Sequence, residues 1–532
     1  MNLLAKEAPL SQTLEKMREV FKKLNIDLEI SSYKNPLKSC YSVNLKAKGA
    51  KNIFSNGKGS TKDEALASAM GEFIERLQTN GVFFDLYLPK RDYFNDVKLF
   101  NSNEGYLNED LIAFYNQELK LEDLIDFSSD EIEKIATLPF RNFKSDEVVY
   151  FPINILNNLY LTNGLAAGNT PTEAQVQALS EIIERFVKFR VLKNGYSLPL
   201  YEDLSKFSDI YEDVEKLKSL GYEFLALDAS LGGVYPVVAT ALIDPKRGTL
   251  FLSFGAHPIF EVALRRSFTE MFQGRDLDEL KEFEMPTFNE ELVSSSFNLE
   301  SHFIDSNAAV HIGLISPKKS FDLKSWKYEG YSRKDELDFL LKCLNGHEIY
   351  MREYDYLGFY SVQMIVPNFS EIYPVSDLIY NNQNSGKKLR SLVLNHERVT
   401  KEELFDALLE LDEMLLVDEL IGVRFEKPFS VAELKASKLL QSGEFEEAKI
   451  YLELSGRVLA HLLVEMIEKE NFQEYLNELS LIFSSKRVEE AVEILNQKRT
   501  FVQTTFCSSY MKTLEIFDAL SVFSPREDKK LS

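Results

Sequence analysis

The stretch G-N-T-P-T-E-A-Q-V-Q-A-L-S-E-I-I-E-R, residues 168–185, occurs in this chain in two related copies. The other copy, G-S-T-K-D-E-A-L-A-S-A-M-G-E-F-I-E-R, lies 109 positions upstream (168 − 59), at residues 59–76. Nine of the eighteen aligned positions are identical without a gap, far more than two unrelated segments would share. In each copy a glycine and a threonine, suited to a turn and a helix N-cap, precede helix-forming residues. The sequence therefore predicts two equivalent turn–helix units.

Each predicted helix carries two glutamates three positions apart, Glu72 and Glu75 in the first copy and Glu181 and Glu184 in the second. Residues at this spacing share one helix face, where two carboxylates repel each other unless a cation lies between them. Mg²⁺ suits such a place because it binds carboxylate and phosphate oxygens. A solvated acidic face is the alternative interpretation of a single pair. Its repetition after the same turn favours a paired acidic metal site.

A third turn–helix unit is predicted after the strand-like residues 249–254. The sequence G-A-H-P at residues 255–258 supplies its turn, and a helix is expected through residue 273. On that helix Arg266 and Glu270 are four positions apart, so they lie on one face. Glu270 is a candidate to join the acidic set, with Arg266 facing an anion. A surface ion pair is the alternative.

Length, charge and cysteine content limit the kinds of protein this chain can be. Its 532 residues suffice for two or three domains, and a net charge of −23 argues against direct nucleic-acid or anionic-membrane binding. The three cysteines lie far apart and offer neither a metal spacing nor a disulfide framework. No run approaches the roughly 18 apolar residues of a membrane span. These properties predict a cytoplasmic protein.

Residues 1–395 are predicted to form an α+β core. Residues 10–28 have the pattern of an amphipathic helix, and the apolar runs 223–228 and 234–243 that of a β-hairpin. Residues 381–388, rich in Asn, Ser and Gly, predict the loop that ends this core.

Residues 396–532 consist mostly of helix-forming residues and predict an all-α domain. Within it, residues 436–448 have the pattern of a helix, a glycine turn and a second helix, which resembles a tetratricopeptide repeat (TPR). We therefore expect a TPR-like helical-hairpin domain with a role in binding a partner.

Other catalytic motifs do not fit. The sequence G-K-G-S-T at residues 57–61 is similar to a phosphate loop, but a Walker loop has Ser or Thr directly after its lysine. The six histidines have no ligand spacing, and the G-x-S-x-G nucleophile motif is absent from the sequence. Any chemistry here is expected to depend on metal and phosphate.

Longer strings resemble the YcaO family, and within it the stand-alone bacterial branch. The matching strings are N-G-K-G-S-T-K at residues 56–62, A-L-A-S-A-M-G-E-F-I-E-R-L at 65–77, L-Y-L-T-N-G-L-A-A-G-N-T at 159–170, V-Q-A-L-S-E-I-I-E-R-F-V-K at 176–188, D-A-S-L-G-G-V-Y-P-V at 228–237, S-F-G-A-H-P at 253–258 and I-V-P-N-F-S-E-I-Y-P at 365–374. Together they span nearly the whole predicted core.

The resemblance implies an ATP-binding fold without a Walker loop, in which helix carboxylates hold Mg²⁺ against the nucleotide phosphates. It implies as metal ligands Glu72, Glu75, Glu181, Glu184 and Glu270. It implies as nucleotide-binding residues Lys6, Thr13, Glu75, Asn169, Gln177, Glu184, Arg185, Arg266 and Glu270. Thr13 stands where the family has a serine, in the short match A-K-E-A-P-L-S-Q-T at residues 5–13.

The family's reaction, as the resemblance implies it, is the ATP-dependent phosphorylation of a peptide amide, which leads to azolines or thioamides. Azoline-forming members typically end in a proline-rich tail, whereas this chain has one proline, Pro525, in its final twenty residues. The stand-alone branch is associated instead with β-methylthiolation of an aspartate on small-subunit ribosomal protein twelve. There it is an accessory factor to a radical enzyme, and this chain has no cysteine cluster for the radical step.

Three hypotheses follow. The chain is an Mg²⁺- and ATP-using enzyme that activates amides or otherwise modifies a protein substrate. Alternatively it is a non-catalytic accessory protein with a regulatory ATP site, whose helical domain binds a ribosomal protein or its radical methylthiotransferase. The third hypothesis is a metal-carboxylate hydrolase unrelated to ATP. The resemblance also implies self-association as a homodimer.

Overall fold

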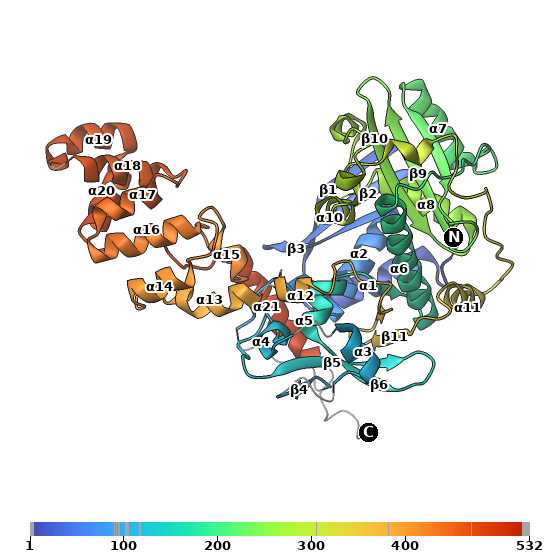
Figure 1. Ribbon diagram of the computed structural model, residues 1–532, viewed down its shortest axis with the longest axis horizontal. Helices are drawn as coiled ribbons and strands as arrows, with labels where there is room; N and C mark the ends of the chain where they lie inside the picture. Colours follow the sequence, from blue (N-terminus) through green and yellow to red (C-terminus); the bar gives the residue numbers. More distant parts are fainter. Residues whose placement is uncertain are drawn as a thin grey trace.

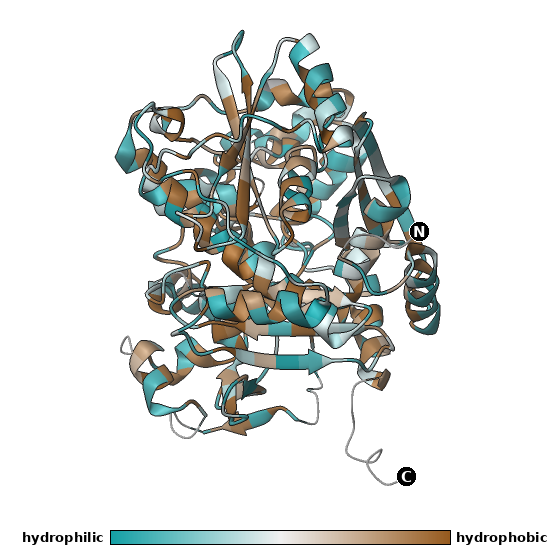
Figure 2. Ribbon diagram, turned by 90° about the vertical axis from the view of Figure 1, so that its right-hand side faces the viewer, coloured by the Kyte–Doolittle hydropathy of each residue, from teal (hydrophilic) through white to brown (hydrophobic). Residues whose placement is uncertain are grey.

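The computed structural model describes residues 5–89, 91, 93, 96–101, 106–115, 119–304, 306–380, 382, 384–469 and 471–523. Helices and strands mix in one core, and a row of helices from the C-terminal part extends to one side of it (Figure 1). In Figure 2 the strands inside the core are largely brown and the outer turns largely teal, as expected for a buried apolar interior. This arrangement confirms the predicted α+β class.

The strands of the core form three antiparallel sheets. The first has the order β1–β2–β3, the second β10–β9–β8, and the third β4–β5–β11–β12–β7, with β6 paired to β5. Their bounds are β1 (Leu28–Leu37), β2 (Cys40–Ala47), β3 (Ala50–Gly59), β4 (Lys98–Phe100), β5 (Ile135–Asn142), β6 (Val148–Pro152), β7 (Leu165–Gly168), β8 (Glu223–Asp228), β9 (Val237–Asp244), β10 (Thr249–Ala256), β11 (Tyr350–Tyr354) and β12 (Tyr360–Ile365). The pairing of β8 with β9 confirms the predicted hairpin. Strands β3, β7 and β10 each stand at one end of their sheet's order.

The helices of the core lie between and around these sheets (Figure 1). They are α1 (Leu10–Lys23), α2 (Lys62–Gln78), α3 (Glu109–Tyr115), α4 (Leu121–Leu124), α5 (Ile153–Ile155), α6 (Pro171–Lys193), α7 (Ser208–Ser219), α8 (Phe260–Met271), α9 (Glu290–Ser294), α10 (Ser296–Ile304), α11 (Arg333–Cys343) and α12 (Asp377–Tyr380). The apolar face of α1 is buried through Leu14, Met17 and Phe21, which confirms the predicted amphipathic helix, although it ends at Lys23 and not at residue 28, where β1 begins.

Three strand–turn–helix units repeat within the core: β3 with α2, β7 with α6, and β10 with α8. In the first two, the side chain of Thr61 accepts the backbone N–H of Glu64, and that of Thr170 accepts the N–H of Glu173, each at 3.2 Å. These bonds satisfy N–H groups that a helix start leaves without partners. Both predicted N-caps are confirmed.

The first and third units share a close contact between strand and helix. A Cβ added at Gly57 would lie 2.1 Å from the Ala65 carbonyl oxygen, and one added at Gly255 would lie 2.3 Å from that of Ala263. Both residues of the second contact follow those of the first by 198 positions (255 − 57 and 263 − 65). Only glycine lets the strand approach the helix this closely. The predicted third unit is therefore confirmed.

The three units also pack on one another in a closed order. Helix α2 lies against β7 of the second unit, α6 against β10 of the third, and α8 against β3 of the first. Each helix is thus held between its own strand and the strand of the next unit. This ring brings the acidic faces of α2, α6 and α8 together near the centre of the core.

The C-terminal part contains α13 (Asn384–Leu394), α14 (Lys401–Ala407), α15 (Val417–Leu420), α16 (Val431–Ser442), α17 (Phe445–Leu452), α18 (Val458–Glu468), α19 (Leu476–Phe483), α20 (Ser485–Leu495) and α21 (Ser508–Phe523). Helices α16 and α17 meet at Gly443, whose φ of 76° ends α16, so the predicted helix, glycine turn and helix are present. The assignment of these helices to a TPR-like class stays a prediction.

Helix α21 returns from this row to the core (Figure 1). Its Tyr510 hydroxyl donates to the Tyr87 carbonyl oxygen at 2.5 Å, and the Phe517 and Phe83 rings lie edge to face with centroids 5.3 Å apart. The division at residues 395 and 396 stays a prediction. In the structure the last described helix is packed on the first part of the chain.

The loop predicted at residues 381–388 is wrong for most of its length. Residues 381 and 383 lie outside the described residues, and α13 begins at Asn384. A Cβ at Gly386 would lie 1.7 Å from the Leu420 carbonyl oxygen, so glycine here permits close packing of α13 near the end of α15. Tertiary packing has overridden a loop-like composition. Within the described ranges, no helix is both long and apolar enough to cross a membrane.

Candidate functional site

The central feature of the site is one glutamate from each of the three units. Glu72 on α2, Glu181 on α6 and Glu270 on α8 follow one another by 109 and 89 positions (181 − 72 and 270 − 181) and occupy the same place in their units. All three side chains are about three-quarters buried. Glu72 pairs with Arg76 at 2.7 Å, and Glu181 pairs with Arg185 at 2.9 Å. The structure thus brings together the carboxylates that the sequence predicted as metal ligands.

Two further predicted glutamates, Glu75 and Glu184, lie one turn along α2 and α6. Burial raises the pKa of Glu75 well above its usual range, and the charges of Glu181 and Glu72 raise it further. Burial also raises the pKa of Glu181, on which Glu184 and Glu72 act in the same direction. Glu184 accepts the backbone N–H of Ala256 at 3.1 Å, across from α6 to the third unit. The carboxylates of α2 and α6 therefore act on one another across the two units.

Lys58 on β3 provides a positive charge within this cluster. Its ammonium forms an ion pair with Glu270, and burial lowers its pKa while the charges of Glu184, Glu72 and Glu181 act to raise it. We did not predict this residue, because the G-K-G-S-T string was set aside as an incomplete Walker loop. The alternation along β3 gave no such signal, because it places Lys58 on the face opposite Gly57, which lies against α2.

Lys58→Met is expected to lower the stability of the metal-free protein by about 1–2 kcal/mol, because the neighbouring carboxylates lose a counter-ion that is only partly screened by solvent. Added Mg²⁺ is expected to reverse most of that loss, since the ion supplies the missing positive charge. Thermal unfolding in EDTA and in Mg²⁺ measures both effects, and Lys51→Met, exposed on the same strand, is the control. An equal loss with and without Mg²⁺ would contradict this role.

Arg266 and Gln177 join the second and third units. The Arg266 guanidinium donates from Nη1 to the Ala256 carbonyl oxygen at 2.9 Å and from Nη2 to Gln177 Oε1. Both partners are neutral, so these bonds orient the guanidinium, while the carboxylates that act on its charge are Glu184, Glu181 and Glu336. Such a fixed guanidinium suits a phosphate oxygen.

The N-terminal segment contributes Lys6 and Thr13 to the same region. Lys6 pairs with Glu173 at 3.1 Å, the Glu7 backbone N–H donates to Glu173 at 3.0 Å, and Thr13 donates to Asn169 Oδ1 at 2.9 Å. Asn169 in turn donates to both oxygens of Glu173 at 3.2 Å. Although burial alone raises the pKa of Glu173, these partners hold it below its usual value. Glu173 was not predicted, yet it connects three residues that were.

The residues present fit Mg²⁺ together with a polyphosphate. Carboxylate oxygens are the ligands Mg²⁺ prefers, and Lys58, Arg76, Arg185 and Arg266 carry the charge that phosphates need. The Nε of Arg76 is buried without a hydrogen-bond partner, which leaves one donor for a ligand. Among the described residues, no three His, Cys, Asp or Glu side chains are close enough to hold a metal by themselves. Phosphate oxygens would therefore have to complete the coordination.

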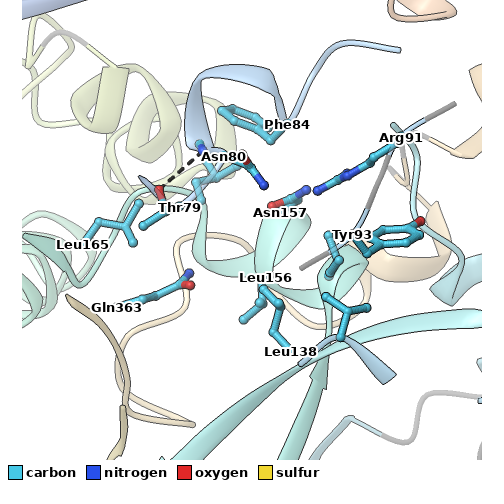
Figure 3. A pocket seen from close by; sticks show the side chains of 14 residues that line it. Thr79, Asn80, Phe84, Arg91, Tyr93, Leu138, Leu156, Asn157, Leu165 and Gln363 are labelled. Carbon is cyan, nitrogen blue, oxygen red and sulfur yellow. Dashed lines mark hydrogen bonds between the residues drawn. The ribbon is translucent and has the colours of Figure 1, made fainter. Parts of the chain in front are cut away.

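A small cavity lies beyond the C-terminal end of α2 (Figure 3). Thr79, Asn80 and Asn157 are among the residues that line it, and the predicted site residues are not. A second hollow is lined in part by Arg185 and Lys193. Of the predicted nucleotide residues, Arg185 alone lines one of these two hollows.

Comparisons with known proteins identify the family of this chain. Residues 56–370 match the family model described as YcaO cyclodehydratase, ATP- and Mg²⁺-binding. The chain is 35% identical over 543 residues to the ribosomal protein S12 methylthiotransferase accessory factor YcaO of Escherichia coli K12, covering 93% of this chain and 92% of the relative. It is 37% identical over 480 residues to an uncharacterized protein of Haemophilus influenzae, covering 84% of this chain and 81% of that one.

Solved structures with a similar fold include YcaO from Methanopyrus kandleri bound with AMPPCP and Mg²⁺, at 18% identity and a TM-score of 0.44, covering 69% of this chain and 93% of that chain. A heterocyclase in complex with substrate and cofactor matches at 18% identity and a TM-score of 0.47, covering 70% of this chain and 55% of that chain.

The fold and site define an ATP- and Mg²⁺-binding protein, and the chain belongs to the YcaO family. The family's description confirms the predicted cofactors, ATP and Mg²⁺. The assignment of the binding residues stays a prediction, and the structure gives the position of each of them.

Proposed function

We propose that this protein binds ATP and Mg²⁺ within the ring of three units and uses them in the modification of a ribosomal protein in the cytoplasm. Two routes are open: phosphorylation of a peptide amide, or assistance to β-methylthiolation of an aspartate by a radical methylthiotransferase. The observation that carries the proposal is the equivalent placement of Glu72, Glu181 and Glu270 beside fixed cationic side chains. The name of the E. coli relative supports the ribosomal substrate.

In this proposal the carboxylates of Glu72, Glu75, Glu181, Glu184 and Glu270 hold Mg²⁺, and Lys6, Thr13, Asn169, Gln177, Arg185 and Arg266 contact the nucleotide. Bound Mg²⁺ would supply stabilisation of the charge that develops on a transferred phosphoryl group. Arg76 and Arg185, each held by a glutamate four residues earlier, keep their guanidinium groups beside the cluster. The buried setting strengthens every one of these charge interactions.

The accessory route follows from a property of the sequence. The three cysteines, Cys40, Cys343 and Cys507, are far apart along the chain, and Cys40 is buried in the core. We therefore assign the radical step to a partner enzyme and ATP use to this chain. The C-terminal row of helices is the part proposed to bind that partner. We also propose that the chain forms a homodimer.

ATP binding is expected to require Mg²⁺, because five carboxylates repel a triphosphate unless a cation lies between them. Removing Mg²⁺ with EDTA should weaken binding about tenfold or more, which is about 1.4 kcal/mol. Isothermal titration of the full chain with ATP, with and without Mg²⁺, measures this. Equal affinity in both conditions would contradict the proposed metal role.

Measuring ATP turnover distinguishes an ATP-using enzyme from an accessory protein with a regulatory ATP site. The full chain is incubated with Mg²⁺, ATP, the ribosomal protein and the methylthiotransferase, and ADP, AMP and the mass of the ribosomal protein are followed. Release of ADP or AMP that depends on the ribosomal protein supports an ATP-using enzyme. Methylthiolation that needs bound ATP without its cleavage supports the regulatory alternative. If neither ATP binding nor an effect on the modification is seen, the proposal is wrong.

A further inference from the structure

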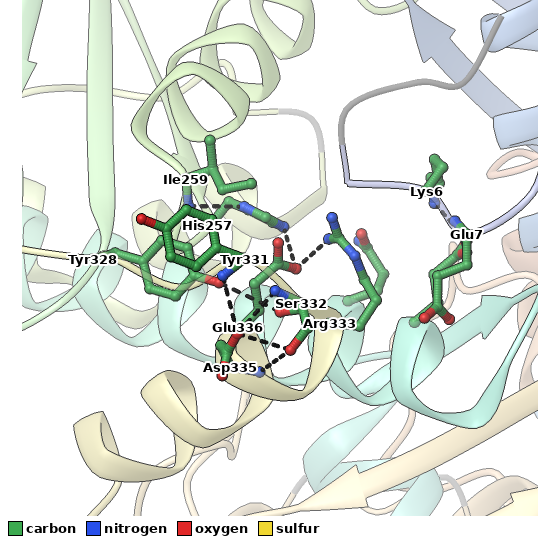
Figure 4. A network of polar contacts seen from close by, with 12 residues as sticks. Lys6, Glu7, His257, Ile259, Tyr328, Tyr331, Ser332, Arg333, Asp335 and Glu336 are labelled. Carbon is green, nitrogen blue, oxygen red and sulfur yellow. Dashed lines mark hydrogen bonds and ion pairs between the residues drawn. The ribbon is translucent and has the colours of Figure 1, made fainter.

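The third unit differs from the other two at its turn. Where the first two units have Gly59 and Gly168, the third has His257. Its Nδ1 accepts the backbone N–H of Ile259, the residue before α8, at 3.0 Å, and the start of α8 has no side-chain cap like the threonines of the other units. Because Nδ1 is an acceptor, the proton lies on Nε2, which faces Glu336 Oε2 at 3.5 Å (Figure 4). His257 is thus a fixed neutral ring between the turn and Glu336.

Glu336 lies at the end of the first turn of α11 and is 2% exposed. It forms an ion pair with Arg333, one turn earlier on the same helix (Figure 4). Burial raises the pKa of Glu336 to about 7, although the charges of Arg333 and Arg266 both act to lower it. Keeping a buried carboxylate of this kind charged costs desolvation free energy. Arg333 is therefore held by a counter-ion that is readily neutralised.

Positive charges converge around His257. Burial lowers its pKa well below the usual range, and Arg266, Arg333 and Lys6 lower it further, in that order. Of these cations, Lys6 pairs with Glu173, and Arg266 is held by neutral acceptors. Helix α11 packs on α6 of the second unit, so Arg333 approaches the predicted nucleotide residues from a helix outside the ring. Figure 4 shows Lys6 and Glu7 on the other side of Arg333 from His257.

We propose that Arg333 is a further anion-binding residue, which contacts the phosphate chain of ATP, and that Glu336, positioned by His257, is its counter-ion while no nucleotide is bound. This inference rests on the proposed ATP site. A guanidinium fork bonds a carboxylate and a phosphate in the same two-pronged geometry, so the triphosphate replaces Glu336 as partner of Arg333. His257 keeps Glu336 in place while the exchange occurs. Without nucleotide, Arg333 is therefore paired with Glu336, and its charge becomes available to the phosphates when ATP binds.

The two members of the pair should have opposite effects on ATP binding. Arg333→Gln removes a charge-assisted bond to phosphate and is expected to weaken Mg²⁺-ATP binding about tenfold. Arg333→Lys should restore part of the affinity. Glu336→Gln leaves Arg333 without its competing partner and should tighten binding several-fold. Lys334→Gln, which removes one exposed positive charge from the same helix turn, is the control and should change the affinity less than about twofold.

The full chain is titrated with Mg²⁺-ATP and, as a probe that has phosphates alone, with Mg²⁺-tripolyphosphate. Thermal unfolding of each variant checks folding, and the double variant Arg333→Gln, Glu336→Gln keeps the buried charge balanced if the single arginine variant is unstable. The double variant should bind ATP as weakly as Arg333→Gln. A change seen with ATP but not with tripolyphosphate would overturn the phosphate contact.

Other outcomes separate the parts of the inference. Unchanged ATP affinity in Arg333→Gln and in the double variant, with a wild type that binds ATP, would overturn the role of Arg333 and leave the proposed function intact. Unchanged or weakened binding in Glu336→Gln would overturn the counter-ion role. A wild type that binds no ATP would remove the proposed function itself.

Discussion

Glu181→Gln is expected to weaken Mg²⁺-ATP binding about 100-fold or more and to abolish any ATP turnover. Replacing even an outer partner of a metal ligand typically costs about 10–100-fold, so a direct ligand should cost at least the upper value. The amide keeps the shape of the side chain and removes its charge. It also releases Arg185, which is held at 2.9 Å, and removes the largest carboxylate influence on Glu75. Isothermal titration and ADP or AMP release measure the two losses.

Glu261→Gln is the matched control, because Glu261 pairs with Arg265 four residues later on α8 at 3.1 Å. That variant breaks the same kind of helix ion pair outside the carboxylate cluster and should leave ATP binding within about twofold of the wild type. Normal Mg²⁺-ATP binding by Glu181→Gln would show that α6 does not supply a metal ligand. Equal losses in both variants would point to helix stability as the cause.

Gly57→Ala is expected to destabilise the protein by about 3 kcal/mol or more, although it adds a single methyl group. The added carbon would lie 2.1 Å from the Ala65 carbonyl oxygen and 2.4 Å from the Ala69 nitrogen, and both are helix backbone atoms that cannot give way separately. Strand β3 must then move away from α2. Since α8 packs on β3, the third unit is disturbed as well. Urea unfolding of the full chain measures the loss.

The control for this variant is Gly456→Ala, where the added Cβ would meet nothing within 4 Å. Its unfolding free energy should change by less than about 1 kcal/mol. Wild-type stability of Gly57→Ala would mean that the strand and helix are not in backbone contact. Gly255→Ala should repeat the large loss, because the Ala263 carbonyl oxygen lies 2.3 Å from the added Cβ.

The repeat made much of the fold accessible from sequence. Shared glycines and threonines located the turns and caps of α2 and α6, and the spacing of the glutamates indicated which helix faces meet. These features are local, so they can be recognised without knowing the tertiary structure. The third unit was recognisable for the same reason, although its helix has no side-chain cap.

The residues that were missed depend on contacts between distant segments. Glu64 and Glu173 occupy the same position in the repeat, but Glu64 accepts the Ser60 N–H in its own turn, whereas Glu173 binds Lys6 and the Glu7 N–H. The different role arises because Lys6 and Glu7 lie against the turn of the second unit. Arg333 and Glu336 were missed likewise, since nothing in their own helix indicates that it lies beside the ring. The loop expected at residues 381–388 failed because the contact of Gly386 is with Leu420, more than thirty positions away (420 − 386).

The ring of three units has a consequence for how a ligand is oriented. If the units were identical, an ion at the centre of the ring would experience the same environment from each of the three units. The third unit breaks this equivalence: His257 replaces a glycine, and Gly274 and Gln273 stand where the others have arginine and glutamate. Negative charge is thereby concentrated on the side of the first two units, and positive charge on the side of Arg266. The repeated glutamates thus form a place for a cation. The different residues of the third unit make one side of that place more positive, so that an asymmetric molecule such as a nucleotide can bind there in one orientation.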